Sequence, residues 1–237
     1  MKKISNIAMS FFIFRVMHML KRFVYLFPIV ICFLHISCDQ ESKHHKDNAK
    51  HANHISSNQI ISKEAIIIDI IPFEDTPPEI INSLSDALSQ ICPNVKVKGI
   101  IAFPENSFYE PRHRYKADSL INYLSSITPT NHVSIGITVK DISTTKEDIS
   151  DWGVMGLSFQ PGNACIASTF RLNKHNLLDQ LFKVSIHELG HTQGLDHCEV
   201  QTCYMRDAEG KNTTDQELGF CDKCKAALFA KGLIKIN

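Results

Sequence analysis

Residues 187–205 read HELGHTQGLDHCEVQTCYM, and this stretch indicates both the fold and the chemistry of the chain. It begins with the pattern H-E-x-x-H, whose two histidines are four residues apart and lie on one face of an α-helix, so both imidazoles can reach one metal ion. Gly194 can take the backbone conformation that ends a helix, after which the chain can turn back. We therefore expect a catalytic zinc site formed by His187, His191 and His197.

The residue that follows the first histidine, Glu188, is the expected catalytic residue. Three protein ligands leave one coordination position of zinc open for water, and a neighbouring carboxylate can accept a proton from that water. Asp196 adjoins the third histidine and is a competing ligand, but the full pattern H-E-x-x-H-x-x-G-x-x-H selects His197. The spacing predicts metal-assisted hydrolysis.

Four cysteines around and after the histidines have the spacing of a structural zinc site. Cys198 and Cys203 form a C-x4-C half, and Cys221 and Cys224 form a C-x2-C half. Four thiolates suit a closed tetrahedral zinc, which stabilises small loops that lack a core of their own. Two disulfides are the alternative, which an exported protein makes less negligible. With the histidines, the favoured interpretation predicts two Zn²⁺ ions per chain, one catalytic and one structural.

These histidines and cysteines, with Met205 between the cysteine pairs, resemble the archaemetzincin family of metzincin zinc metallopeptidases. The resemblance extends from Ile61 to the C-terminus. It implies that Met205 forms an apolar floor beneath the zinc site, since a thioether is a poor match for a histidine-bound zinc. It also implies that a strand at the sheet edge, just before the zinc helix, binds extended peptide substrate, and Ala164–Thr169 matches that place in the order.

The apolar pattern predicts an α/β fold of the α+β metzincin-like kind, with a mixed twisted sheet packed on helices. A long zinc-binding helix and a small C-terminal helical part with the four-cysteine site complete it. Predicted strands are Ile66–Ile71, Val95–Phe103, His132–Ile142, Val154–Phe159 and Ala164–Phe170. Predicted helices follow Thr76 as far as Ile91, span Tyr115–Ile127, and span Leu177–Gly194.

Some side chains are expected to be buried and others to lie at the surface. The buried side of the long helix is expected to consist of Leu178, Leu181, Val184 and Ile186. Cys92 and Cys165 are expected to be small buried apolar side chains. Surface or helix-end charges are expected at Arg112, His113, Arg114 and His175.

The N-terminal region predicts export. Phe23–Ser37 is apolar, follows Lys21 and Arg22, and is too short for a comfortable membrane span but suits a signal peptide. Residues 34–38, LHISC, resemble a bacterial lipoprotein box with Cys38 as the lipidated residue; an ordinary signal peptide and an uncleaved anchor are alternatives, and translation can start at an internal methionine, Met17 or Met19. We expect a leader over residues 1–38, a flexible linker over 39–63 and a catalytic domain over 64–237.

The predicted function is that of a zinc metallopeptidase tethered to the cell envelope through its N-terminal anchor or lipid, with peptide or protein substrates. A cytoplasmic location follows if the leader does not function. The 237 residues carry no net formal charge, so nothing favours nucleic acid as a partner. Hydrolysis of another amide or an ester is a second hypothesis, because the same chemistry serves both. A non-catalytic, zinc-stabilised binding module is a third, although such a module needs no general base.

Overall fold

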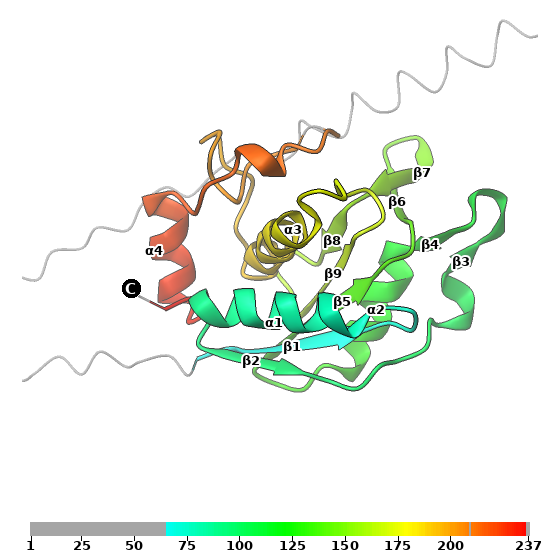
Figure 1. The fold of residues 1–237 in the computed structure, drawn as a ribbon, viewed down its shortest axis with the longest axis horizontal. Coiled ribbons are helices and arrows are strands. Elements are labelled where there is room, and N and C mark those ends of the chain that lie inside the picture. Colours follow the sequence, from blue (N-terminus) through cyan, green and yellow to red (C-terminus); the bar gives the residue numbers. More distant parts are fainter. Residues whose placement is uncertain (1–64, 209, 236–237) are drawn as a thin grey trace, which may run out of the picture. The chain divides into compact units, whose positions relative to one another are not determined.

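The computed structural model describes residues 65–208 and 210–235 (Figure 1). The larger of its two sheets has the strand order β2-β1-β5-β9-β8. Strands β2, β1, β5 and β9 are parallel, whereas β8 runs antiparallel to β9 and forms one edge of the sheet. These strands are β1 (Ile67–Pro72), β2 (Asn94–Val97), β5 (His132–Thr138), β8 (Gly156–Ser158) and β9 (Ala164–Ser168).

Helices cover both faces of this sheet. Strands with nearly continuous apolar runs need this cover, because successive side chains point to opposite faces. In β5, Ile135 and Ile137 join the apolar cluster under α1 and α3, whereas Gly136 between them lies against Leu124 of α2 on the other face. The helices are α1 (Pro78–Ile91), α2 (Ala117–Ile127), α3 (Leu177–Thr192) and α4 (Asp222–Ala230) (Figure 1).

A smaller sheet with the order β3-β4-β6-β7 was not predicted from the sequence. After its last strand the chain continues through Met155 into β8, and the N–H of Ser168 donates to the carbonyl oxygen of Met155 at 2.8 Å. The two sheets are therefore joined along the edge that faces α3. The strands are β3 (Phe108–Tyr109), β4 (Arg114–Lys116), β6 (Ile142–Lys146) and β7 (Ile149–Val154), and the short 3₁₀ helices are η1 (Glu105–Ser107), η2 (Glu110–Arg112) and η3 (Thr214–Gln216).

The C-terminal helical part packs on the same core as α1 and α3. Leu228 of α4 and the following Leu233 are fully buried in that cluster. The backbone ties this part to the rest, because the N–H of Ile66 donates to Gly232 and that of Lys235 donates to Ile91. The segment that carries the last two cysteines is thus held against the domain rather than forming a separate module.

The predicted α/β architecture is confirmed, but the predicted edge strand is wrong. All five residues of β9 (Ala164–Ser168) are buried, and β9 lies between β5 and β8. The edge is formed by β8, which lies within the predicted strand Val154–Phe159 but is shorter, at three residues. Two further predictions are wrong. The second strand ends at Val97 rather than Phe103, and Leu178 of α3 is 46% exposed rather than buried.

The surface prediction for Arg114 is also wrong. Its side chain is 14% exposed and lies between two aspartates, whereas Arg112, His113 and His175 are exposed as expected. Cys92 and Cys165 are both buried free thiols, which confirms their predicted role in packing.

Among the described residues, none of the helices combines the length and the apolar character needed to cross a membrane. The leader and linker predicted at residues 1–38 and 39–63 lie outside the described residues.

Candidate metal centres and active site

Helix α3 and the turn after it bring three histidines together. The helix is buried on most sides, and it places His187 and His191 one turn apart. Beyond its end, Gly194 has a φ of +78°, a left-handed conformation that suits glycine, and the N–H of Leu195 donates back to Gly190 at 3.2 Å. This turn reverses the chain and carries His197 to the two helical imidazoles.

The three imidazoles have the arrangement of a metal site. Their candidate ligand atoms all lie within 4.8 Å of one another. Nδ1 of His187 donates to the carbonyl of Tyr204 and Nδ1 of His191 donates to that of Leu195, each at 2.7 Å. Both Nε2 atoms are then left with a lone pair, and they converge to 2.9 Å. Such outer hydrogen bonds fix the tautomer and ring direction of histidine ligands, so the residues fit a zinc ion.

The electrostatics of the pair favour the form that binds metal. Burial, followed by the neighbouring His191, lowers the pKa of His187 to about 3. Burial also lowers the pKa of His191, against an opposing hydrogen bond to the Leu195 carbonyl. Both imidazoles are therefore neutral at physiological pH, and the neutral ring is the ligand form.

Glu188 lies beside this group, against the edge strand. Its buried carboxylate packs on Gly156 of β8 so closely that a Cβ atom at Gly156 would lie 2.6 Å from Oε1. Burial raises the pKa of the Glu188 carboxyl to about 7, although a hydrogen bond with the Ser158 side chain opposes the rise. A carboxyl with a pKa near neutrality can both accept and return a proton, as general acid–base catalysis requires.

Met205 lies under the zinc-binding helix and is fully buried. Its sulfur packs on Gly190, where an added Cβ atom would lie 2.4 Å from Sδ. Its carbonyl oxygen accepts a hydrogen bond from the N–H of Cys198 at 2.7 Å. Met205 thus contacts the helix with its side chain and the residue after His197 with its backbone.

The four predicted cysteines also come together. The sulfur atoms of Cys198, Cys203, Cys221 and Cys224 lie within 4.8 Å of one another, and all four residues are free thiols. The Cys198 and Cys221 sulfurs are 3.7 Å apart, whereas a disulfide requires about 2.05 Å. A close group of four cysteines fits a structural zinc, which four thiolates hold in a closed tetrahedral site.

The surroundings of these sulfurs favour a thiolate at Cys221 but not at Cys203. Burial raises the pKa of the Cys203 thiol, and the backbone N–H groups of Cys221 and Met205, which donate to its Sγ at 3.3 and 3.5 Å, oppose the rise. The hydrogen bond from the backbone of Cys224, followed by contacts with the other sulfurs, lowers the pKa of Cys221 to about 7. Cys221 directly precedes α4, where the helix dipole also favours negative charge.

Of the residues weighed as alternatives, Asp196 lies outside the histidine group and accepts a hydrogen bond from Gln160 at 2.8 Å. Three residues around the site were not predicted. Gly156 and Ser158 contact Glu188 from the edge strand, and Asp207 has an oxygen 3.5 Å from Nδ1 of His197. Asp207 could have been noticed in the sequence because it comes two residues after Met205. Gly156 and Ser158 reach Glu188 only through tertiary contact, so no local sequence pattern indicates them.

A cavity of about 460 Å³ opens beside His187 and Glu188. Its walls are formed by residues 144–146 of β6, the stretch from Trp152 in β7 to Leu157 in β8, Arg171, the part of α3 that begins at Lys183, and described residues between Arg206 and Glu217. His187 and Glu188 both line this cavity, so a bound substrate can reach both side chains.

Comparison with known proteins identifies the family of this chain. The family model for peptidase family M54 matches residues 65–229. Archaemetzincin from Haloquadratum walsbyi is 28% identical over 179 residues, which cover 69% of this chain and 100% of that protein. Archaemetzincin from Methanopyrus kandleri is 28% identical over 154 residues, which cover 63% of this chain and 86% of that protein.

Solved structures share the fold. The crystal structure of archaemetzincin from Methanopyrus kandleri superposes with a TM-score of 0.60 at 24% identity, covering 70% of this chain and 96% of that one. That from Archaeoglobus fulgidus gives a TM-score of 0.58, also at 24% identity, covering 68% and 99%. Because the family match spans nearly all of the described residues, this chain belongs to peptidase family M54, the archaemetzincins, and is a zinc metallopeptidase.

Proposed function

We propose that the chain hydrolyses peptide bonds with Glu188 as general base and with His187, His191 and His197 as the ligands of a catalytic zinc. The observation that carries the proposal is the convergence of two unprotonated Nε2 atoms at 2.9 Å beside a buried carboxylate, at the wall of a cavity that admits a substrate.

A zinc ion held by the three imidazoles would lower the pKa of a bound water and polarise the scissile carbonyl. Glu188 accepts the proton of the attacking water and then delivers it to the leaving amine. Its packing against Gly156 holds the carboxylate on the cavity side of α3. A near-neutral pKa allows the same group to do both, since neither protonation state is strongly favoured at pH 7.

The substrate is proposed to bind along β8 as an extended strand. As the outermost strand of the larger sheet, β8 pairs with β9 on one side only. An edge strand can pair its outward backbone groups with an added peptide, and this mode aligns the peptide along the cavity that β8 lines. The peptide was expected to pair with Ala164–Thr169. Because β8 covers that strand, we propose that the peptide pairs with β8 instead.

We assign a second, structural zinc to Cys198, Cys203, Cys221 and Cys224. Its proposed function is to brace His197, which directly precedes Cys198 in the chain. The close sulfur group and the low pKa of Cys221 support this assignment. A zinc count on purified protein that gives two ions per chain, and one after mutation of Cys221, is the expected result.

The proposed location is the cell envelope, with residues 1–38 as a leader, 39–63 as a linker and 64–237 as the catalytic domain. The support is the sequence pattern that ends at Cys38. Membrane fractionation together with mass measurement of the mature N-terminus tests it. A lipid on Cys38 that is lost in Cys38→Ser is the expected result, and an unprocessed protein in the soluble fraction overturns it.

The test of the catalytic proposal compares the wild type with Glu188→Gln, which keeps the size of the side chain but cannot accept a proton. Both are assayed for zinc content and for cleavage of a peptide library. Glu110→Gln is the matched control, because Glu110 is 77% exposed and lies outside the cavity lining. We expect zinc-dependent cleavage by the wild type and the control, and a loss of about 10²–10⁴-fold in kcat for Glu188→Gln.

Equal activity of all three proteins would remove Glu188 from the mechanism. A wild type that binds zinc fully and cleaves no peptide would leave hydrolysis of another amide or ester, which a panel of such substrates then tests, or a binding role.

A further inference from the structure

The cavity beside the catalytic residues is lined by more cations than carboxylates. Five basic side chains reach its surface from four different parts of the chain. They are Lys146, Arg171, Lys183, Arg206 and Lys211. The carboxylates on the same surface are those of Glu188, Asp207 and Glu217.

The three carboxylates do not neutralise the positive charge of the five basic side chains. The Glu188 side chain packs on Gly156 and is hydrogen-bonded with Ser158, and Asp207 lies 3.5 Å from Nδ1 of His197. Burial raises the pKa of Glu217 to about 7, so this group carries only part of a charge at neutral pH. A negatively charged group that enters the cavity therefore meets a net positive surface.

Arg171 is the cation whose position is most firmly set. It comes from the loop between β9 and α3, and its Nη2 contacts both carboxylate oxygens of Asp141, at 2.8 and 3.0 Å. The guanidinium lies flat on Gly153 of β7, where a Cβ atom would lie 2.1 Å from Nη2. Glycine at this position allows the group to cross the strand and reach the cavity. Asp141 occupies one side of the guanidinium fork, which leaves other N–H donors for a ligand.

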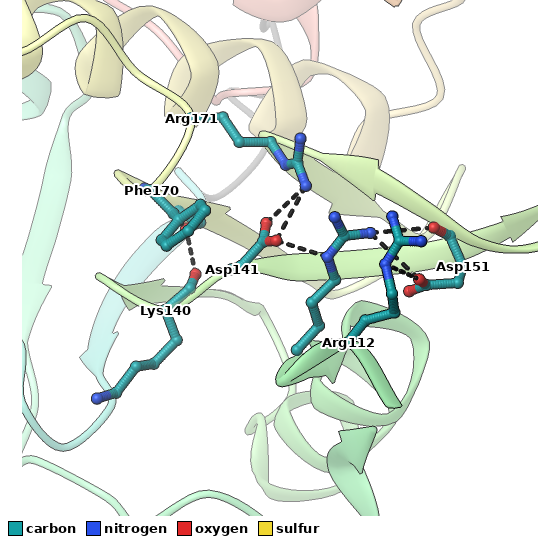
Figure 2. A network of polar contacts seen from close by, with 8 residues as sticks. Arg112, Lys140, Asp141, Asp151, Phe170 and Arg171 are labelled. Atoms are coloured by element: carbon teal, nitrogen blue, oxygen red, sulfur yellow. Dashed lines mark hydrogen bonds and ion pairs between the residues drawn. The ribbon is translucent and has the colours of Figure 1, made fainter. Parts of the chain in front are cut away.

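Arg171 stands at one end of a chain of ion pairs that carries excess positive charge. Figure 2 shows Arg171 with Asp141 at one end and Arg112 with Asp151 at the other. Between them, Arg114 contacts Asp141 at 2.6 Å and Asp151 at 3.3 Å. Three guanidinium groups and two carboxylates leave one positive charge. Arg112 is 60% exposed and its charge is screened by solvent, whereas Arg171 is 31% exposed and borders the cavity.

Lys183 supplies a second fixed cation, one turn before His187 on α3. Its side chain is 10% exposed, and its Nζ donates to the carbonyl of Thr214 at 3.0 Å and lies 2.8 Å from Asp179. Asp179 is itself 56% exposed, so it screens the ammonium only partly. Lys183 and Arg171 thus approach the cavity from the α3 wall and the β7 wall.

We propose that this cavity selects substrates that place a carboxylate in it, next to the bond to be cleaved, and that Arg171 with Lys183 determines that specificity. The inference rests on the proposed peptide hydrolysis. The substrate class is a peptide with an aspartate or glutamate beside the scissile bond, or one whose C-terminal carboxylate lies there. Arginine suits this role because its planar fork matches the two oxygens of a carboxylate.

The experiment uses zinc-loaded wild type and matched fluorogenic peptides. One series exchanges Glu for Gln at each of three positions on either side of the cleaved bond, and a second exchanges a free C-terminal acid for an amide. We expect kcat/KM to be about tenfold higher for the acidic member at one position, with a smaller ratio at 0.5 M salt. The series that shows the ratio identifies the source of the carboxylate. Equal rates for acidic and neutral members in both series overturn the proposal.

Variants then assign the residues. Arg171→Gln and Lys183→Met are each expected to lower the acidic-to-neutral ratio, and Arg171→Lys to retain part of it. Lys96→Gln is the control, because Lys96 is an exposed cation on β2, at the opposite edge of the sheet. A ratio that stays at the wild-type value in both Arg171→Gln and Lys183→Met overturns the assignment. Thermal unfolding shows which variants fold. If Arg171→Gln does not fold, the acidic-to-neutral ratios of Arg171→Lys and Lys183→Met are compared with that of the wild type.

Binding separates this inference from the proposed function. Glu188→Gln is titrated with the same peptides and followed by fluorescence anisotropy. Tighter binding of the acidic member supports the cavity assignment even if the wild type cleaves no peptide. Cleavage by the wild type without any acidic preference leaves the hydrolase standing and removes the specificity proposal.

Discussion

Gly156 of the edge strand and Glu188 of the zinc-binding helix are in direct contact, with no room for a side chain between them. This contact sets the position of the carboxylate. In Gly156→Ala the new Cβ atom would lie 2.6 Å from Oε1, so the carboxylate must move. We expect kcat to fall by about 10²-fold, because misplacement of a catalytic group by about 1 Å has an effect of that size.

The measurement is kcat on a cleaved peptide, normalised to bound zinc. Gly99→Ala is the control, because no atom lies within 4 Å of a Cβ at that position. A Gly156→Ala protein with full zinc and wild-type kcat would show that Glu188 does not depend on this contact.

Gly190→Ala tests the packing of Met205 under the helix. The added Cβ atom would lie 2.4 Å from Sδ and 3.1 Å from Cε of Met205, so the thioether must shift within a buried site. We expect the free energy of unfolding to fall by about 1–3 kcal/mol, which is typical of overpacking. Urea unfolding of zinc-loaded protein measures it. Met205→Ala removes the side chain that the new Cβ atom would meet. The double variant Gly190→Ala/Met205→Ala should therefore lose less stability than the two single variants lose together. A loss equal to the sum of the two single losses contradicts the contact.

Cys221→Ser tests the coupling between the two metal centres. Its sulfur lies 3.7 Å from that of Cys198, the residue after the third histidine. We expect loss of one zinc per chain and a fall in kcat/KM, because His197 loses its brace. The control is Cys92→Ala, which removes a buried thiol outside the four-cysteine group. Unchanged activity together with an unchanged zinc count refutes the coupling.

The buried carboxyl of Glu217 predicts a pH dependence of stability. Burial raises its pKa in the folded protein to about 7 from 4.5, against the opposing charges of Lys183 and Arg206. The folded state therefore binds more protons than the unfolded state between these values, and the stability present below pH 4.5 is lost as the pH rises to about 7. Glu217→Gln has no such group and keeps its stability.

Melting temperatures of wild type and Glu217→Gln at pH 5 and pH 8 measure this effect. We expect similar values at pH 5 and a variant that is more stable by about 2–6 °C at pH 8. Glu110→Gln, which alters an exposed carboxyl, should follow the wild type at both pH values. A constant difference between wild type and Glu217→Gln across the range contradicts the raised pKa.

The histidines and cysteines were predictable because their geometry follows from short-range spacing. Residues four apart on a helix share a face whatever the rest of the fold does, so His187 and His191 could be paired from sequence. The turn at Gly194 has a local signal of the same kind. Helices α1 and α2 were predicted within about two residues of their ends, because their apolar period is strong.

The cavity walls could not be predicted because they depend on tertiary contact. Arg171 reaches the cavity only because Gly153 of β7 lacks a side chain, and nothing near either residue in the sequence indicates the other. The smaller sheet includes strands of two and three residues, such as Phe108–Tyr109, which carry no detectable period. The run Ala164–Ser168 lacks the alternation of a half-exposed edge strand, and that feature indicates an interior strand.

Hydrogen bonds to the carbonyl groups of Tyr204 and Leu195 fix the orientation of the two helical imidazoles within the protein itself. Loading the catalytic metal therefore demands little rearrangement, and stripping it should leave the polypeptide folded and the rings still directed at the same point. The direction of these two ligands is therefore set by the folding of the chain and not by the metal.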